Sequence, residues 1–279
     1  MRKSRHFMAA LYLLYDRELK KNMYYGMIML SEIWKRRYCM SAVRKKYIIR
    51  LIVRCAILVA CIVMYLVGSA EYQILEGMNF FNRFSVFHIL WVIWVVDMIQ
   101  QIIPLRNTLP LGSMKLFASR YRPSRQEIHY EALHQHIVTT TKAAYKVFLL
   151  WCALLAVIGI LYYTGIINKQ ILFLISVTFY VCDLICVLIW CPFRLMMKTR
   201  CCTTCRIFNW DHLMMFSPLF FIGGFFGLSL AFLAAVDWLV WELYVMMYPE
   251  RFWDKSNMAL KCSECTDKLC TQYCQKSRR

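Results

Sequence analysis

Long, uninterrupted blocks of apolar residues dominate the chain and predict membrane-spanning helices. Hydrophobic residues make up 60% of the 279 positions, and the mean hydropathy is +0.47. A soluble domain of this length would instead distribute its apolar residues with the period of a helix or a strand. The pattern therefore predicts an all-α, polytopic helical membrane protein with four to five transmembrane helices. The expected spans are 51–68, 84–103, 147–163, 171–190 and 213–248.

The last block, residues 213–248, does not fit a simple crossing. A single straight helix of that length would be about 54 Å long at 1.5 Å per residue, against a hydrocarbon core of roughly 30 Å. Two full crossings would need about 40 residues and a turn. Because Pro218, Gly223 and Gly224 interrupt the block near its start, we expect a re-entrant or broken segment followed by a second helix.

The apolar blocks divide the chain into three regions. Residues 1–50 are basic and amphipathic, which is typical of a segment in the cytoplasm or in the headgroup plane. Residues 51–248 form the predicted transmembrane domain, and residues 249–279 form a Cys-rich tail. Arg50 and Arg54 lie at the start of the first predicted span, where we expect both to snorkel to the interface.

The formal charge of +18 is distributed beside the apolar blocks. This placement favours contact with the anionic headgroups of a bilayer, and no nucleic-acid-binding module accompanies it. The basic flanks alternate with flanks that are poor in Lys and Arg, so the positive-inside rule predicts a cytoplasmic N-terminus. The basic tail then also belongs inside, which requires an even number of crossings. Five full spans with the tail outside remain an alternative.

Four cysteines of the tail lie close enough to act together. Cys262, Cys265, Cys270 and Cys274 have the spacing C-x2-C-x4-C-x3-C, and a CxxC pair directs two sulfurs at one point. Zinc held as a structural staple is the first interpretation of this spacing. An iron–sulfur cluster and, for an outward-facing tail, disulfides are the alternatives.

A second cysteine group, Cys201, Cys202 and Cys205, forms a CCxxC turn with one ligand too few for a tetrahedral site. Asp211 or His212 could complete it, and so could a cysteine of the tail. The turn could instead be a redox-active dithiol, because neighbouring Lys and Arg side chains would favour the thiolate.

The run "RCCTTCRIFNWDHLMMFSPL", together with "PERFWDKSN", "KCSECTDKLC" and "TQYC", resembles a family of uncharacterised, Cys-rich multi-pass membrane proteins of Gram-positive, often anaerobic, bacteria. The likeness covers residues 200–279. It implies a location in the bacterial plasma membrane and carries no activity over to this chain.

Carboxylates within the apolar blocks are the remaining candidate site. Asp97, Asp183 and Asp237 lie at membrane depth, and Glu242 lies near it. A lone charge at this depth is costly, so it faces the bundle interior, a partner or a water-filled cavity. These residues predict either a proton or cation path or carboxylates anchored by nearby arginines.

Three functions follow from these residues. The first is a scaffold, or a subunit of a membrane assembly, whose zinc module holds loop and tail together and which contacts another membrane protein or a second copy. The second is a membrane redox protein with an iron–sulfur cluster or a reactive dithiol. The third is a small transporter that uses the intramembrane carboxylates. No catalytic motif distinguishes an enzyme among them.

Overall fold

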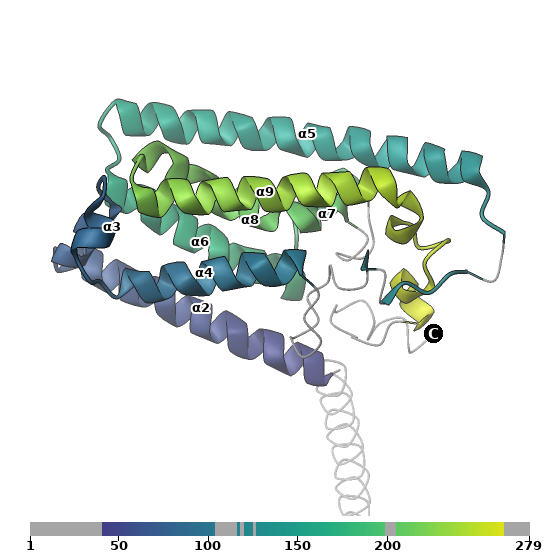
Figure 1. Cartoon of the computed structure of the whole chain (residues 1–279), viewed down its shortest axis with the longest axis horizontal. Helices are drawn as coiled ribbons and strands as arrows, with labels where there is room; N and C mark the ends of the chain where they lie inside the picture. Colours follow the sequence, from purple (N-terminus) through teal and green to yellow (C-terminus); the bar gives the residue numbers. More distant parts are fainter. Residues whose placement is uncertain (1–40, 104–115, 118–119, 125–126, 199–204, 265–279) are drawn as a thin grey trace, which may run out of the picture. The chain divides into compact units, whose positions relative to one another are not determined.

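The computed structural model describes residues 41–103, 116–117, 120–124, 127–198 and 205–264 (Figure 1). The chain divides into two units, and the first comprises Met1–Ser41 and Thr271–Arg279. Apart from Ser41, the first unit lies outside the described residues, and so does most of the predicted basic region 1–50. The second unit, Ala42–Cys270, carries the site described below.

The described residues form helices and one isolated bridge between Pro123 and Asn257, with no strand among them. Four helices are long and apolar enough to cross a membrane, which confirms the all-α polytopic fold. These are α2 (Ala42–Leu66), α5 (Tyr130–Tyr163), α6 (Lys169–Leu188) and α9 (Phe225–Met247). A shorter apolar helix, α4 (Phe87–Ile102), lies between α2 and α5 in the chain.

Large apolar side chains on the outer faces of these helices are exposed. Ile52 and Val59 of α2 and Leu149 and Ile160 of α5 are each more than half exposed. Contiguous apolar surface of this kind marks a membrane or protein contact in an otherwise folded chain. The exposed faces therefore fit the acyl chains of a bilayer.

Two helices begin well before their apolar blocks. Helix α2 starts at Ala42 rather than at residue 51, and α5 starts at Tyr130 rather than at residue 147. The apolar pattern marks the part of a helix that lies at membrane depth, whereas backbone hydrogen bonding continues through the polar first turns. The difference changes the position of Arg54 in its helix.

The broken segment predicted for 213–248 is present. It consists of α8 (Asp211–Phe216), the 3₁₀ helix η6 (Ser217–Ile222) and α9. At their standard rises per residue, α8 and η6 together extend only about 20 Å, too short to cross. The chain turns at Gly223, which has φ 75°, and at Gly224, where a Cβ would lie 2.3 Å from the Leu75 carbonyl oxygen.

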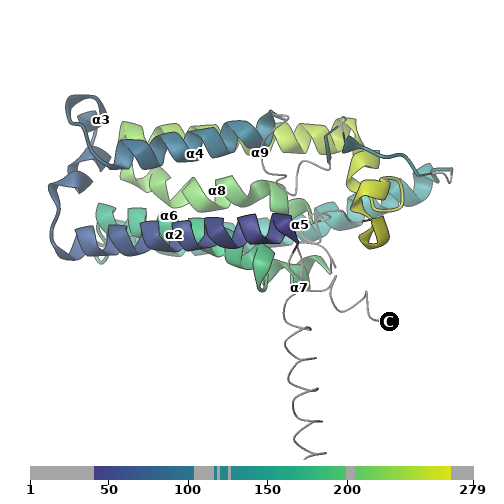
Figure 2. The ribbon, with the colours of Figure 1, turned by 90° about the horizontal axis from the view of Figure 1, so that it is seen from below.

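Within this unit the helices form two layers with α8 between them (Figure 2). Helix α2 packs along α6, and α4 packs along α9. Helix α8 contacts both α6 and α9. A core of aromatic side chains around Trp94 and Phe173 joins the layers.

The two ends of the bundle differ. At the first end, which we call the turn end, the Phe225 N–H donates to the Gly77 carbonyl at 2.9 Å. At the opposite end, which we call the basic end, the Met258 N–H donates to the Arg122 carbonyl at 2.8 Å. The first turn of α2, the start of α5 and the chain after α9 all lie at the basic end (Figure 1).

Short elements complete the two ends. They are η1 (Ala70–Leu75), α3 (Asn79–Asn82), α7 (Phe193–Met197), η5 (Arg206–Trp210), η7 (Pro249–Phe252), η8 (Met258–Leu260) and η9 (Cys262–Glu264).

Candidate functional site

Polar side chains from five elements meet inside the bundle. We call them the polar cluster, and its members come from α2, α4, α6, α8 and α9. Polar groups at membrane depth are costly unless they find partners, so their gathering indicates a site. The members are Arg54, Asp97, Gln101, Tyr180, Asp183, Asp211, His212 and Asp237.

Arg54 organises one half of the polar cluster. Its guanidinium donates to the Asp183 carboxylate at 2.9 Å and to the Tyr180 carbonyl at 2.7 Å, and it lies 3.9 Å from the Asp97 carboxylate. The same group stacks over the Tyr180 ring, 3.7 Å from its centroid, which is a cation–π contact. The Tyr180 hydroxyl in turn donates to Asp97 at 3.3 Å.

Our expectation that Arg54 snorkels to the interface is wrong. The residue is 7% exposed and lies in the thirteenth position of α2, because the helix begins at Ala42. Its stem is therefore too deep to reach the interface easily, and two carboxylates satisfy the charge instead.

His212 organises the other half. Its Nδ1 lies 3.0 Å from the Asp237 carboxylate and 3.4 Å from that of Asp211. Gln101 donates from Nε2 to Asp211 at 3.0 Å. Two carboxylates within 3.4 Å of one imidazole favour its protonated, cationic form.

The polar cluster holds more acidic than basic side chains. Among the described residues, the carboxyls are Asp97, Asp183, Asp211 and Asp237, and the cationic groups are Arg54, His212 and, at the edge, Arg50. Full ionisation would leave a net negative charge at a depth where charge is expensive. At least one carboxyl is thus expected to carry a proton or to be compensated by a bound cation.

A small polar cavity lies within the cluster. Its volume is about 20 Å³, which suffices for one water molecule. Its walls include Asp97, Asp183, Asp211 and His212. One water molecule in this space could connect the Arg54 half to the His212 half through hydrogen bonds.

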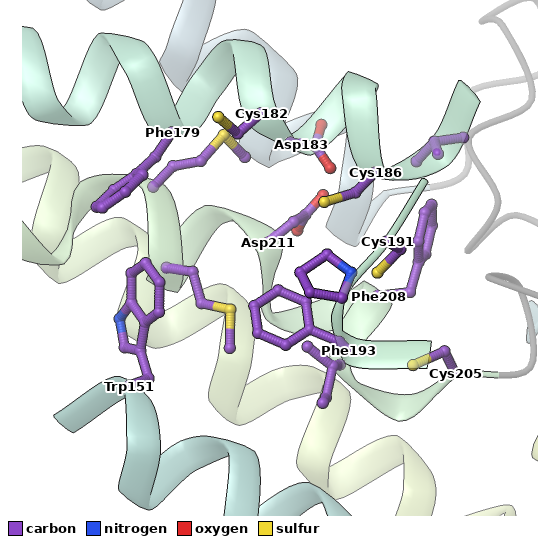
Figure 3. Close-up of a pocket in the computed structure, with 15 residues that line it drawn as sticks. Trp151, Phe179, Cys182, Asp183, Cys186, Cys191, Phe193, Cys205, Phe208 and Asp211 are labelled. Carbon is purple, nitrogen blue, oxygen red and sulfur yellow. The ribbon is translucent and has the colours of Figure 1, made fainter. Parts of the chain in front are cut away.

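A larger, almost entirely apolar pocket adjoins the polar cluster (Figure 3). Its volume is about 240 Å³, and aromatic rings of Trp151, Phe179 and Phe208 line it. Asp183 and Asp211 line both this pocket and the small cavity. The two carboxylates therefore form the wall between the polar cluster and the apolar pocket.

A separate polar contact lies nearer the basic end. Arg206 of η5 forms a bidentate ion pair with Glu242 of α9, and the Trp210 indole N–H donates to the same carboxylate at 2.8 Å. Glu242 is thus anchored by an arginine, as one of the two interpretations of the intramembrane carboxylates predicted.

The intramembrane carboxylates predicted from the sequence lie in three different helices. Asp97 lies in α4, Asp183 in α6 and Asp237 in α9. Sequence reasoning missed that Arg54 and Gln101 join them. A signal did exist: both are strongly polar residues inside helices of high mean hydropathy, and a polar residue in that position needs a partner.

Most of the predicted metal ligands cannot be placed. Cys201, Cys202, Cys265, Cys270 and Cys274 lie outside the described residues, and Cys262 is described only by its backbone in η9. Cys205 is buried and lines the apolar pocket. In the described part of the chain, no three His, Cys, Asp or Glu residues converge to hold a metal ion. Asp211 and His212, considered as completing ligands, are bonded within the polar cluster.

Comparisons with known proteins give no relative: no protein-family model, curated protein or solved structure matches this chain.

Proposed function

We propose that this protein is an integral membrane protein of the small-transporter type that relays protons through its polar cluster. The observation that carries the proposal is that the polar cluster holds four carboxyls against three cationic groups, Arg54, His212 and, at its edge, Arg50. Intramembrane carboxyls and histidines in contact with one another are the usual components of proton relays.

The contacts support a proton rather than a metal cation as the relayed species. The carboxyls are held in pairs by Arg54 and His212, and among the described residues they do not converge on one point as ligands of a cation would. In the same part of the chain, one Asp237 oxygen is buried without a hydrogen-bond partner. That oxygen is available to accept a proton and release it.

The positive-inside rule gives the protein an orientation in the membrane. Basic residues gather at the basic end, whereas residues 68–83 contain one, Arg83. We therefore assign the basic end to the cytoplasm, with the N-terminus and the start of the tail on that side of a bacterial plasma membrane. The contact between residues 122 and 258 supports this arrangement, because it holds the start of the tail beside the loop that leads to α5.

A flux experiment tests the relay. The full chain is reconstituted in vesicles that contain a pH-sensitive dye, and a potassium gradient with valinomycin supplies the driving potential. We expect proton flux above that of empty vesicles, and we expect Asp183→Asn to lower it roughly a hundredfold, the order contributed by a positioned proton carrier. Asp254→Asn is the matched control, because Asp254 is exposed outside the bundle.

Two results would contradict the relay. One is wild-type flux no greater than that of empty vesicles, and the other is an Asp183→Asn flux equal to that of Asp254→Asn. Thermal melting in detergent is measured beforehand, so that flux is compared only between folded variants.

The tail supports a separate proposal, that Cys262, Cys265, Cys270 and Cys274 bind a structural zinc ion. The C-x2-C spacing carries it. We expect elemental analysis of anaerobically purified protein to find about one zinc per chain, and Cys265→Ser to lose it. Cys152→Ser, an exposed cysteine of α5, should retain the zinc. If the analysis finds iron and acid-labile sulfide instead, the tail holds an iron–sulfur cluster and the zinc proposal is wrong. If it finds no metal, both the zinc site and the cluster are excluded.

A further inference from the structure

The apolar pocket carries thiols that the proton relay does not use. Cys186 lies in the last turn of α6 and Cys191 follows that helix, and both line the pocket. The two side chains lie close enough to interact electrostatically, and Figure 3 shows both in the wall of the same pocket. Both occur as thiols in this structure. A disulfide needs its sulfurs at about 2.05 Å, so the two side chains must turn toward each other before the bond can form.

The end of α6 allows the Cys191 side chain to rotate while Cys186 stays in place. The helix ends at Leu188, and the Ile185 carbonyl accepts hydrogen bonds from the N–H groups of Ile189 and Trp190. Cys191 therefore lies on the segment that leaves the helix, whereas Cys186 is held by the helix itself. A rotation of the Cys191 side chain need not disturb the packing of α6.

The size and lining of the pocket suit a flat, lipophilic ligand. Its volume of about 240 Å³ exceeds the roughly 150 Å³ cavity that binds one benzene. Trp151, Phe179 and Phe208 offer ring faces, and Cys182, which is exposed, also lines the pocket. Because Cys182 is exposed on a helix that is apolar enough to span the membrane, a molecule dissolved in the bilayer can reach the pocket there.

We propose that Cys186 and Cys191 are a redox-active thiol pair that a membrane-soluble quinone, bound in the apolar pocket, oxidises to a disulfide. The sulfur–sulfur bond forms as two S–H bonds break. The quinone accepts the two electrons and two protons and becomes the quinol. Asp183 and Asp211, the carboxylates on the pocket wall, are placed to carry the protons between thiols and quinone oxygens.

This chemistry goes beyond the proton relay and stands without it. The protons that the thiols release equal those that the quinone takes up, so the step needs no proton from either side of the membrane. The pair also differs from the dithiol predicted at Cys201, Cys202 and Cys205, because it uses none of these three cysteines.

The test uses the full chain in detergent, reduced and then freed of reductant under nitrogen. The probe is decylubiquinone, whose fully substituted ring disfavours direct addition of thiols. We expect its absorbance change to report one quinone reduced for each disulfide formed, and peptide mapping to find the bond between Cys186 and Cys191. Cys186→Ser or Cys191→Ser should lower the initial rate at least about tenfold, because the attacking or the resolving thiol is missing.

Two further variants test whether the reaction depends on these two thiols and on the pocket. Cys152→Ser, an exposed cysteine of α5 outside the pocket, should react like wild type. Cys182→Phe leaves the pair intact but narrows the pocket, so we expect a higher KM for the quinone. Thermal melting checks that each variant is folded.

Two outcomes would overturn the proposal. In the first, quinone reduction in Cys186→Ser and Cys191→Ser continues at the rate of Cys152→Ser. In the second, a disulfide forms between other cysteines while this pair stays reduced. Asp237→Asn keeps these results apart from the relay, because Asp237 belongs to the polar cluster but does not line the apolar pocket; this variant should lower proton flux and still permit one disulfide per quinone.

Discussion

Replacing Arg54 by Met is expected to destabilise the bundle by about 3–5 kcal/mol, the range measured when one partner of a buried ion pair is removed. Asp183 and Asp97, whose side chains are 16% and 23% exposed, would lose the guanidinium that now lies 2.9 Å and 3.9 Å away. The Tyr180 carbonyl would also lose its donor. Denaturant titration in detergent micelles, followed by circular dichroism, measures this loss.

Two comparisons make this prediction specific. Arg120→Met changes an exposed arginine by the same substitution and should alter the free energy of unfolding by less than about 0.5 kcal/mol. Arg54→Met combined with Asp183→Asn should recover part of the stability, because position 183 is then neutral and only the Asp97 carboxylate lacks its cation. If Arg54→Met is no less stable than Arg120→Met, the ion pair does not contribute as described.

Trp94→Ala is the second large effect that we expect, with a loss of about 3–5 kcal/mol. The Trp94 side chain is 0% exposed, and its ring lies 4.9 Å from that of Phe216 and 5.7 Å from that of Tyr180. Truncation would leave a cavity at the junction of the two layers. It would also remove support from the Tyr180 ring over which Arg54 stacks.

A matched variant and a milder one complete this experiment. Trp190→Ala removes a tryptophan that is 59% exposed at the end of α6, so its effect should be much smaller. Trp94→Phe keeps most of the ring packing, and within the described chain the Trp94 indole N–H has no hydrogen-bond partner to lose. Equal melting temperatures for Trp94→Ala and Trp190→Ala would show that Trp94 is not central to the core.

The apolar blocks predicted the helical membrane fold, because the formation of a membrane-spanning helix depends on the apolar character of one continuous segment. A helix satisfies its own backbone hydrogen bonds, so a long apolar block has few other ways to enter a membrane. The break in the last block was visible in the sequence for the same reason, because glycines that interrupt a helix are a local signal. The structure explains why glycines are needed there: Gly223 has a positive φ, and Gly224 leaves no room for a side chain. The helix starts were not visible, because polar first turns carry no apolar signal.

The partners in the polar cluster could not be predicted in the same way. Arg54 and Asp183 are 129 positions apart, and Gln101 and Asp211 are 110 apart. Each residue alone indicated only that it needed a partner. The packing of α2 against α6, and of α8 between α6 and α9, decided which partner it has.

The sequence by itself determined that this chain is a helical membrane protein with costly carboxylates at membrane depth and grouped cysteines. Those properties follow from the transfer free energies and spacing of individual residues, which are local quantities. Only the tertiary structure decided that Arg54 is buried between Asp97 and Asp183, that His212 links Asp211 to Asp237, and that Cys186 and Cys191 line one apolar pocket. Those contacts depend on how distant helices pack, and side-chain packing is a property of the whole bundle.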